Sequence, residues 1–373
     1  MGRHAASLGP SPRPRGMLKA LAVAAVLTLA VVLGLHVTTG SDPVAAPRST
    51  SASPSPTASS SAPATIIPGA HFGTRILTLD ELKTKYAAEG KTYVSGDPSK
   101  PTTFVSASYN VLGSSHAKNG PSRAARGGSL LRSKGVSVVG LQELQSNQRS
   151  SLLNASGFTS YPAESGLNGE NSIAWDPDVW QLVDGEMQSI PYFFGKNRQM
   201  PIVLLRHIET GRMMWWMNVH NPADVFGCKC GGWRAKAVAV EVAKINVLHA
   251  DGTPVFFTGD LNDRSAVVCK VAVGTGMRSA DGSYAAGGKG GSCRQSGSLW
   301  IDWIWGSGDQ VEFADYDRDY RTRNSPRMSD HPMITSTTTI APANADQACT
   351  KYKRHEKTYW FCPDPTLSVG QSQ

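Results

Sequence analysis

The sequence predicts an α/β or α+β fold built around large β-sheets, and two observations carry this prediction. Runs rich in β-branched and aromatic residues alternate along the chain with stretches of helical periodicity. The strand-like runs predominate over the helical ones, so the sheets should be large. The sequence contains no evident internal repeat.

The predicted strands are short apolar runs, and the last of them lies at 331–340. They cover residues 102–112, 136–144, 171–177, 213–222, 253–262, 298–306 and 331–340. A helical pattern covers 122–135, where two glycines weaken the helix. Another covers 233–250, which has an apolar stripe of helical spacing and a helical length.

Residues 1–40 are predicted to direct export rather than to join the fold. Basic residues precede an uncharged apolar run at 20–37 that is long enough to span a membrane. Positive charge before this run holds the N-terminus in the cytoplasm, so the remainder is exported. The small residues in "VAAP" leave a cleaved signal peptide and an uncleaved membrane anchor as alternatives. We therefore expect an extracytoplasmic protein, either secreted or membrane-anchored.

Residues 41–67 are predicted to be a disordered linker. Most of them are Ser, Ala, Pro or Thr, so the segment has too little apolar surface to offset the entropy of ordering. The globular domain then begins near residue 68. It is mildly basic within a chain of net charge +8, which suits a polyanionic partner and equally suits an ordinary soluble protein.

The six cysteines all lie in the expected exported domain, which predicts disulfide bonds. They are Cys228, Cys230, Cys269, Cys293, Cys349 and Cys362. Proximity along the chain favours Cys269–Cys293 and Cys349–Cys362, which leaves Cys228–Cys230, although sequence alone does not fix the pairing. A zinc site built on "CKC" is the alternative for the first two cysteines.

The segment between the last two cysteines interleaves basic and aromatic residues. They are Lys351, Tyr352, Lys353, Arg354, His355, Lys357, Tyr359 and Trp360. Such a mixture suits phosphates and stacked bases. The other interpretation is a solvated, disulfide-closed hairpin that only packs on the domain. We therefore divide the globular part into a main domain at 68–345 and a basic, disulfide-closed tail at 346–373.

Polar residues of the kinds used in catalysis recur at or near the ends of the apolar runs. They are Asn110, Glu143, His220, Asp260, Asn262, Asp302, Asp330 and His331. Strand ends commonly carry reactive groups, because the sheet is rigid and the loops are open. Structural alternatives exist: Asn110 could be a turn residue, Glu143 a first-turn acid of a helix, and His220 a structural histidine.

The stretch "GDLN" places an acid and an amide two residues apart. On a continuing strand, Asp260 and Asn262 would point the same way and offer hard oxygen atoms to a divalent cation or a phosphate. The alternative is a turn that closes the strand. Asp302, between apolar neighbours in "LWIDWIW", would be costly to bury unless paired, and "SDH" supplies a partner in His331.

The motifs "SYNVL", "LQEL", "NVH", "GDLN", "IDWIW" and "SDH" occur in this order between about residues 103 and 340. Together they resemble the endonuclease/exonuclease/phosphatase superfamily, which includes deoxyribonuclease-like nucleases, apurinic endonucleases, sphingomyelinases and inositol-polyphosphate phosphatases. The resemblance implies a four-layer sandwich of two packed mixed β-sheets flanked by helices. It also implies a metal-dependent hydrolase of phosphoester bonds.

The resemblance assigns metal and phosphate roles residue by residue. Glu143 is similar to the main magnesium ligand, with Asn110 beside it and Asp330 as a further acid on the metal side. Asp260 and Asn262 resemble the pair that handles the attacking water and the scissile phosphate.

The same resemblance implies two catalytic histidines. His331 resembles the main one and Asp302 its orienting carboxylate, while His220 resembles the second histidine of the deoxyribonuclease, sphingomyelinase and phosphatase branches. Glu170 stands where some branches place an acid that orients this second histidine.

Four residues are candidates for binding the substrate: Asn110, Glu170, Asn171 and Arg198. Leu261 departs from the pattern, since many members carry an aromatic residue between the Asp and the Asn. Because leucine is also apolar, we expect no loss of chemistry.

We therefore expect an exported phosphoesterase that depends on Mg²⁺ or Mn²⁺, most simply a monomeric nuclease that cleaves phosphodiester bonds by in-line attack of water. The proton acceptor is either Asp260 or His331. One alternative is a phospholipid, sphingomyelin or phosphoinositide phosphodiesterase or phosphatase, brought near the membrane by the N-terminal segment. The other is a non-catalytic binding protein on the same fold.

Overall fold

The computed structural model describes residues 76–163, 170–342 and 349–368. All of them belong to one compact unit, Phe72–Gln373. The predicted leader at 1–40 and the predicted linker at 41–67 lie outside the described residues. Within the described ranges, no helix combines the length and the apolar character needed to cross a membrane.

A six-stranded sheet carries the N-terminal motifs, in the order β14-β15-β2-β3-β5-β4. Its strands are β2 (Thr102–Asn110), β3 (Val136–Gln142), β4 (Thr159–Tyr161), β5 (Ser172–Trp175), β14 (Val311–Asp319) and β15 (Met333–Ile340). In this sheet β2 and β3 are parallel, and every other pair of neighbouring strands is antiparallel, so the sheet is mixed.

A second six-stranded sheet has the order β10-β13-β9-β8-β7-β6. Its strands are β6 (Trp180–Pro191), β7 (Asn197–His207), β8 (Met213–His220), β9 (Val255–Asp260), β10 (Arg278–Ser279) and β13 (Asp302–Gly306). Here the β8–β9 pair is the parallel one. A short 3-10 helix, η1 (Phe193–Gly195), forms the tip between β6 and β7.

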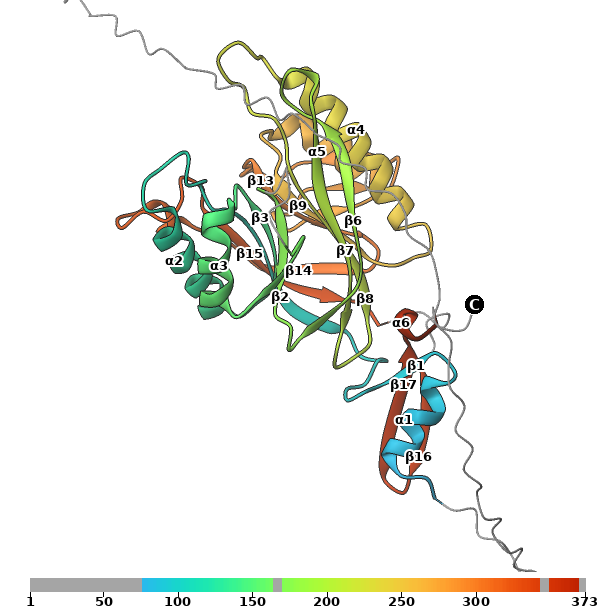
Figure 1. Ribbon diagram of the computed structural model, residues 1–373. Helices are drawn as coiled ribbons and strands as arrows, with labels where there is room; N and C mark the ends of the chain where they lie inside the picture. Colours follow the sequence, from blue (N-terminus) through green and yellow to red (C-terminus); the bar gives the residue numbers. More distant parts are fainter. Residues whose placement is uncertain (1–75, 164–169, 343–348, 369–373) are drawn as a thin grey trace, which may run out of the picture. The chain divides into compact units, whose positions relative to one another are not determined.

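The two sheets pack face to face and helices cover their outer faces (Figure 1). Phe104, Trp216 and Phe256 lie in the apolar layer between the sheets. On one side, α2 (Gly120–Ser133) and α3 (Ser146–Ser156) share a core with β2 and β3. On the other, α4 (Gly231–Leu248) and α5 (Ser265–Thr275) share a core with the second sheet. The predicted four-layer sandwich is confirmed.

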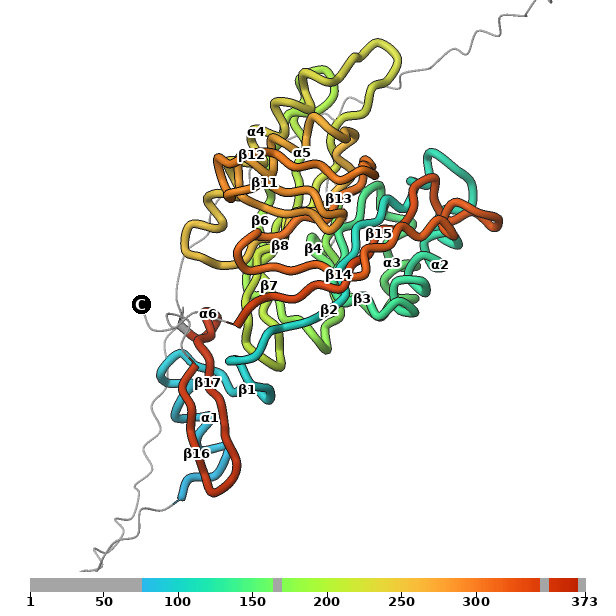
Figure 2. The backbone as a smooth tube through the Cα atoms, turned by 180° about the vertical axis from the view of Figure 1, so that it is seen from behind, coloured from blue at the N-terminus to red at the C-terminus, as the bar shows by residue number. Residues whose placement is uncertain are grey.

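Two short strands, β11 (Tyr284–Ala286) and β12 (Ser292–Arg294), lie beside α5 (Figure 2). The Cys269–Cys293 disulfide ties α5 to β12. Cys228–Cys230 and Cys349–Cys362 are also bonded, so the pairing that chain proximity favours is present and the zinc alternative on "CKC" is wrong.

The basic tail forms a hairpin that pairs with the start of the globular domain. β17 (Lys357–Pro363) lies between β16 (Thr350–Arg354) and β1 (Lys91–Val94), and α1 (Leu79–Ala87) packs on this three-stranded sheet. A last helical turn, α6 (Pro365–Ser368), follows β17.

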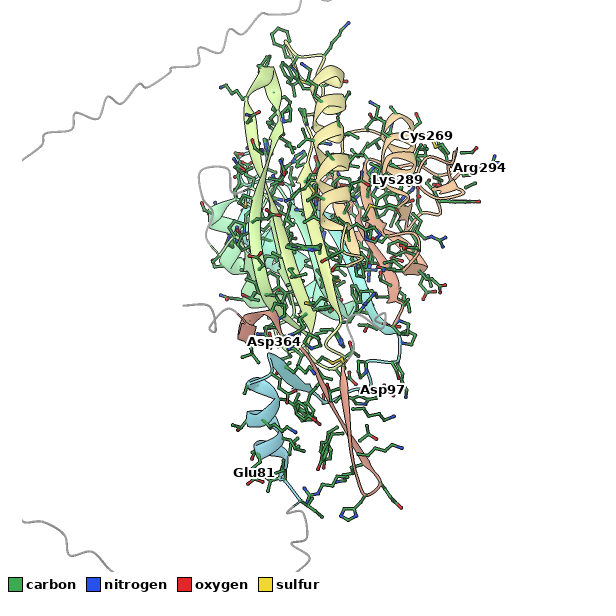
Figure 3. All side chains as sticks on the ribbon, turned by 90° about the vertical axis from the view of Figure 1, so that its right-hand side faces the viewer. Glu81, Asp97, Cys269, Lys289, Arg294 and Asp364 are labelled. Carbon is green, nitrogen blue, oxygen red and sulfur yellow. A yellow bond between two sulfur atoms is a disulfide. The ribbon has the colours of Figure 1, made fainter. Side chains whose placement is uncertain are left out.

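Contacts at the turn between β7 and β8 tie the small sheet to the sandwich. Asp364, labelled in Figure 3, forms an ion pair of 2.9 Å with Arg206, and both side chains are buried. Cys362 Sγ lies 3.9 Å from the Thr210 carbonyl oxygen. This turn is at the opposite end of β8 from His220, about 23 Å along an eight-residue strand.

The predicted strands and both predicted helices occur near their expected places, but several elements were not predicted. These include α1, α3, α5, β1, β6, β7 and β14, whereas β16 and β17 form the disulfide-closed hairpin that was one of the two interpretations of the tail. β6 buries only Trp180 and Ile190 and its other residues are half-buried or exposed, so it has no clear apolar period. Residues 331–340 are not the last strand, since β16 and β17 follow.

Gly140 gives the fold a testable constraint. A Cβ at this position on β3 would collide with Thr258 Oγ1 and Asn218 Oδ1 of the facing sheet. We expect Gly140→Ala to lower the free energy of unfolding by about 1–3 kcal/mol, because overpacking must separate the sheets or displace these side chains. Chemical denaturation measures the loss. Gly232→Ala, where a Cβ meets nothing within 4 Å, is the control, and an equal effect of both changes would contradict the prediction.

Candidate active site at the edge of the two sheets

The parallel pairs bring the predicted residues to one edge of the sandwich. Asn110 ends β2 beside Gln142, the last residue of β3, and His220 ends β8 beside Asp260, the last residue of β9. Asp302 begins the antiparallel strand β13 opposite Asp260. Because parallel strands end at the same side of a sheet, residues far apart in sequence share this edge.

The backbone at the edge adopts conformations that ordinary side chains rarely take. Leu112, Glu143 and Asn262 have φ values of 58°, 59° and 48°. Left-handed non-glycine residues are uncommon and cluster at functional sites, where the surrounding structure holds them. Glu143 and Asn262 follow the ends of β3 and β9, and their left-handed conformation ends the extended backbone there.

Glu143 is held on both carboxylate oxygens. Oε1 accepts from Asn110 Nδ2 at 2.9 Å, and Oε2 accepts from the Gly113 N–H at 2.9 Å. Burial acts to raise the pKa of this carboxyl, but the charge of His220 and the two hydrogen bonds outweigh it and lower the pKa. Glu143 is therefore an ionised carboxylate with a side chain that remains 16% exposed.

The predicted pairing of Asp302 with His331 is present. His331 Nδ1 lies 2.8 Å from Asp302 Oδ2 and 3.0 Å from Oδ1, and Trp300 Nε1 donates to Oδ2 at 2.8 Å. Burial lowers the pKa of His331, but the carboxylates of Asp302, Asp260 and Asp330 raise it to about 10. Burial also raises the pKa of Asp302, so near neutral pH the pair shares one proton between His331 Nδ1 and the Asp302 carboxyl.

Asp260 lies at the centre of the arrangement and is almost fully buried. Its Oδ2 is 3.6 Å from His220 Nε2 and 3.7 Å from His331 Nε2, and it accepts from Asn110 Nδ2 at 3.2 Å. Its Oδ1 accepts from the Asn262 N–H at 3.0 Å. One carboxylate therefore faces both predicted catalytic histidines.

The strand argument for "GDLN" is wrong, and the turn alternative is correct. β9 ends at Asp260, and Asn262 has left the extended conformation, so the two side chains do not alternate along a strand. The Asn262 amide instead donates to the Asn221 carbonyl at 2.9 Å. Its backbone N–H donates to the Asp260 side chain two residues earlier, which is the hydrogen bond of an Asx turn.

The candidate substrate-binding residues gather beside this centre. Arg198 forms an ion pair of 3.2 Å with Glu170 and lies 4.6 Å above the Tyr192 ring. Glu170 also accepts from Gln145 Nε2 at 2.9 Å.

Several buried polar atoms at this edge have no hydrogen-bond partner among the described residues, and two of them belong to predicted site residues. Within the described ranges, no hydrogen bond reaches Nδ1 of His220, and none reaches Oδ1 of the buried Asn171. The hydrogen bonds of Glu170 therefore do not include the predicted one to His220. Asn171 Nδ2 lies 3.3 Å from Met200 Sδ.

Two predicted metal-side residues have other contacts. Asn110 presents its Nδ2 to Glu143 and Asp260, while its Oδ1 accepts from the Leu112 N–H at 3.0 Å. Asp330 is exposed and forms an ion pair of 3.7 Å with Arg327.

Two groups of side chains at this edge offer ligand atoms of the kind that a divalent cation binds. Asp260, Asp302 and His331 have ligand atoms within 4.8 Å of one another. However, His331 Nδ1 is committed to Asp302, so this group is an acid–histidine pair beside a carboxylate rather than an open cage. Glu143 is ionised and partly exposed, each of its oxygens accepts one hydrogen bond, and His116 Nε2 lies 3.8 Å from Oε2, so lone pairs remain for a cation. Mg²⁺ keeps several waters and needs only one or two carboxylates plus the substrate, so Glu143 fits it.

Sequence reasoning missed the residues that position the loops. Arg123 on α2 is buried and donates to the carbonyls of Val111, Gly113 and Met328, thereby joining the loop after β2 to the segment before His331. Ser329 Oγ donates to the Asn110 carbonyl at 2.6 Å. An arginine on a helix gives no signal of these partners. Trp300, two residues before Asp302, could have been found as a donor for that buried acid.

No family model and no curated protein sequence matches the chain. Solved structures do match it in shape. An endonuclease/exonuclease/phosphatase family protein from Bacteroides thetaiotaomicron is 15% identical, with 65% of this chain and 99% of that chain covered and a TM-score of 0.49. A humanized TDP2 from D. rerio is 21% identical, covering 63% and 98%, with a TM-score of 0.50. The human Nocturnin catalytic domain, solved with a sulfate anion, is 15% identical, covering 67% and 97%, with a TM-score of 0.50.

The chain shares the fold of these TDP2 and Nocturnin structures. The resemblance that the motifs predicted is therefore confirmed at the level of the fold. At these identities the comparison shows the fold alone.

The Asp302–His331 pair yields a test of the site. Asp302→Asn keeps the shape of the side chain but loses the charge that holds and stabilises the protonated ring. We expect phosphodiester hydrolysis to fall by about 10³–10⁴-fold, as for other acid–histidine pairs, with an unchanged circular dichroism spectrum. Asp309→Asn, which neutralises an exposed acid near His249 outside this edge, is the control. A rate within tenfold of wild type in Asp302→Asn would remove the pair from the mechanism.

Proposed function

We propose that the protein is an exported, metal-dependent phosphodiesterase, with nucleic acid as the favoured substrate. The observation that carries the proposal is the convergence on Asp260 Oδ2 of His220 Nε2, His331 Nε2 and Asn110 Nδ2 at 3.2–3.7 Å. Glu143 joins this group through Asn110. Phosphodiester hydrolysis needs these parts: a proton acceptor, donors for phosphoryl oxygens and a proton donor for the leaving oxygen.

His331 is the proposed proton donor to the leaving oxygen of the scissile phosphodiester. Its raised pKa keeps it protonated near neutral pH, and Asp302 fixes the ring through Nδ1, so Nε2 presents a proton to the edge. Asp260 is then the proposed acceptor of the proton from the attacking water, since its carboxylate faces the same space. The chain thus supplies a separate acid and base.

Glu143 is the residue that would hold Mg²⁺ or Mn²⁺. The bound ion would supply Lewis-acid stabilisation of charge on the phosphoryl oxygens. Asn110 keeps the Glu143 carboxylate oriented, and it links that carboxylate to Asp260. His220, 3.6 Å from Asp260, is placed to hydrogen-bond a second phosphoryl oxygen.

The mildly basic charge of the domain, 32 Lys and Arg against 28 Asp and Glu over residues 68–373, supports nucleic acid as the partner. A different feature supports the phospholipid alternative. Phe226 is fully exposed, and Val225 and Phe194 are 45% and 60% exposed. A Cβ at Gly195 would touch the Trp233 ring, so the η1 tip lies beside the start of α4, where the 225–230 loop ends. Such an apolar tip near the catalytic edge suits contact with lipid.

Metal removal separates the enzyme from a non-catalytic binding protein. EDTA should abolish hydrolysis of bis(p-nitrophenyl) phosphate, and Mg²⁺ or Mn²⁺ should restore it, because Glu143 alone cannot neutralise a phosphoryl group. A panel of DNA, RNA, sphingomyelin and phosphoinositide vesicles then ranks the substrates. Full activity in excess chelator would sink the metal-dependent mechanism. If the protein hydrolysed the lipid substrates and did not hydrolyse DNA or RNA, the phospholipid alternative would be correct.

Export is proposed on the N-terminal segment and on the cysteines. The chain begins with basic residues before an apolar run, and none of its cysteines is free. Fractionation of the source cells should therefore find the domain outside the cytoplasmic membrane, either tethered or released. A thiol reagent should titrate no cysteine in the native protein. Recovery in the cytoplasm with six reactive thiols would contradict the assignment.

A further inference from the structure

Three arginines surround Trp300 beside the catalytic pair. The guanidinium carbons of Arg264, Arg318 and Arg323 lie 5.4, 6.0 and 6.0 Å from the centre of the Trp300 ring. These distances are within the range of cation–π attraction. The same tryptophan donates from Nε1 to Asp302, which holds His331. These three residues are called the arginine group. They contact the ring of Trp300, and Trp300 is linked to His331 by two successive hydrogen bonds through Asp302.

Both sheets contribute to the arginine group. Arg264 directly precedes α5, shortly after Asn262, and Trp300 comes just before β13. The Leu261 N–H donates to the Ile301 carbonyl at 2.9 Å, which places these two segments side by side. From the other sheet, Arg318 lies on β14 and Arg323 on η2 (Tyr320–Arg323). The edge that joins Asp302 to His331 thus also assembles the arginines.

The positive charge of the group is not neutralised by the protein. Within the described ranges, none of the three guanidinium groups forms an ion pair with a carboxylate. Arg318 is fixed by Tyr316 Oη and by the hydroxyl and carbonyl of Ser298. Arg264 and Arg323 are exposed, and their side chains make no hydrogen bond among the described residues. Three like charges around one ring repel each other, and an anion would relieve that repulsion.

We propose that Arg264, Arg318 and Arg323 bind a second, non-scissile phosphate of a nucleic-acid strand, next to the phosphate that is cleaved. The inference rests on the proposed function and deepens it, because it makes the preferred substrate one with at least two consecutive phosphates. A guanidinium offers paired N–H donors that match phosphate oxygens. Arg318 is held in place by its hydrogen bonds, and Arg264 and Arg323 would contact the phosphate from the second and the first sheet, respectively.

Two small substrates isolate the effect of the second phosphate. A dinucleoside monophosphate has one phosphate, and a trinucleoside diphosphate has two. We expect kcat/KM of the wild type to be roughly tenfold higher for the trinucleotide, the effect of one charge-assisted hydrogen bond. A trinucleotide with a neutral methylphosphonate beside the cleaved bond should behave like the dinucleotide.

The double variant Arg264→Ala/Arg323→Ala should lose more on the trinucleotide than on the dinucleotide, so that the ratio of the two kcat/KM values falls toward one. The slope of log KM against log salt for an oligonucleotide should become shallower by about 0.7 for each phosphate that the variant no longer neutralises. Lys353→Ala/Lys357→Ala is the matched control. It removes two positive charges from the β16–β17 hairpin, whose sheet joins the sandwich at the far end of β8 from His220.

The outcomes are distinguishable. A wild-type ratio in the arginine variant, with continued cleavage of oligonucleotides, would overturn the phosphate subsite and leave the nuclease assignment intact. An equal fall of the ratio in the lysine control would also overturn it, because general attraction by charge would then explain the preference. No hydrolysis of any oligonucleotide by the wild type, with turnover of phospholipid vesicles, would contradict the proposed function itself.

Discussion

The arrangement depends on a buried amide that links the two sheets. Asn218 of β8 donates from Nδ2 to the carbonyls of Leu141 and Ser172, and its Oδ1 accepts from Gln142 Nε2 at 2.7 Å and Thr258 Oγ1 at 3.2 Å. Three of the strands that Asn218 joins carry a site residue near the same end. Glu143 follows β3, His220 ends β8 and Asp260 ends β9. A slip between the sheets would break these hydrogen bonds and separate Glu143 from Asp260.

The same constraint explains how the edge holds buried charge. Asp260 and Asp302 are almost fully buried and face each other across antiparallel strands, which would be unfavourable without compensation. Trp300 and the Asn262 N–H compensate part of this charge from the same side. The other sheet adds the rest: Asn110 donates to Asp260, and His331 pairs with Asp302. Neither sheet can form the site alone, because each supplies the partners that the charges of the other require. The arginine group around Trp300 likewise draws its members from both sheets.

The sequence was most informative where a residue type conflicts with its surroundings. Asp302 among aromatic residues required a partner, so its pairing with His331 was predictable, and the family resemblance that the motifs carry implied the sandwich. It was least informative for contacts that leave no local pattern. Nothing in residues 91–94 indicates that they pair with 360–363, and Arg123 gives no sign that it ties together two site loops. The left-handed turn at Asn262 was also ambiguous, because Asp and Asn suit both a ligand pair and a turn.

Our central claim is that Glu143 holds the cation while Asp302 and His331 act as a hydrogen-bonded pair. Titration of the protein with Mn²⁺, followed by the electron paramagnetic resonance of the free ion, tests this claim most directly. Glu143→Gln should lose a Mn²⁺ site that the wild type has, and Asp302→Asn should keep it, because the Asp302 carboxylate is engaged by His331 and Trp300. Loss of the site in Asp302→Asn with retention in Glu143→Gln would contradict the account and place the cation among Asp260, Asp302 and His331.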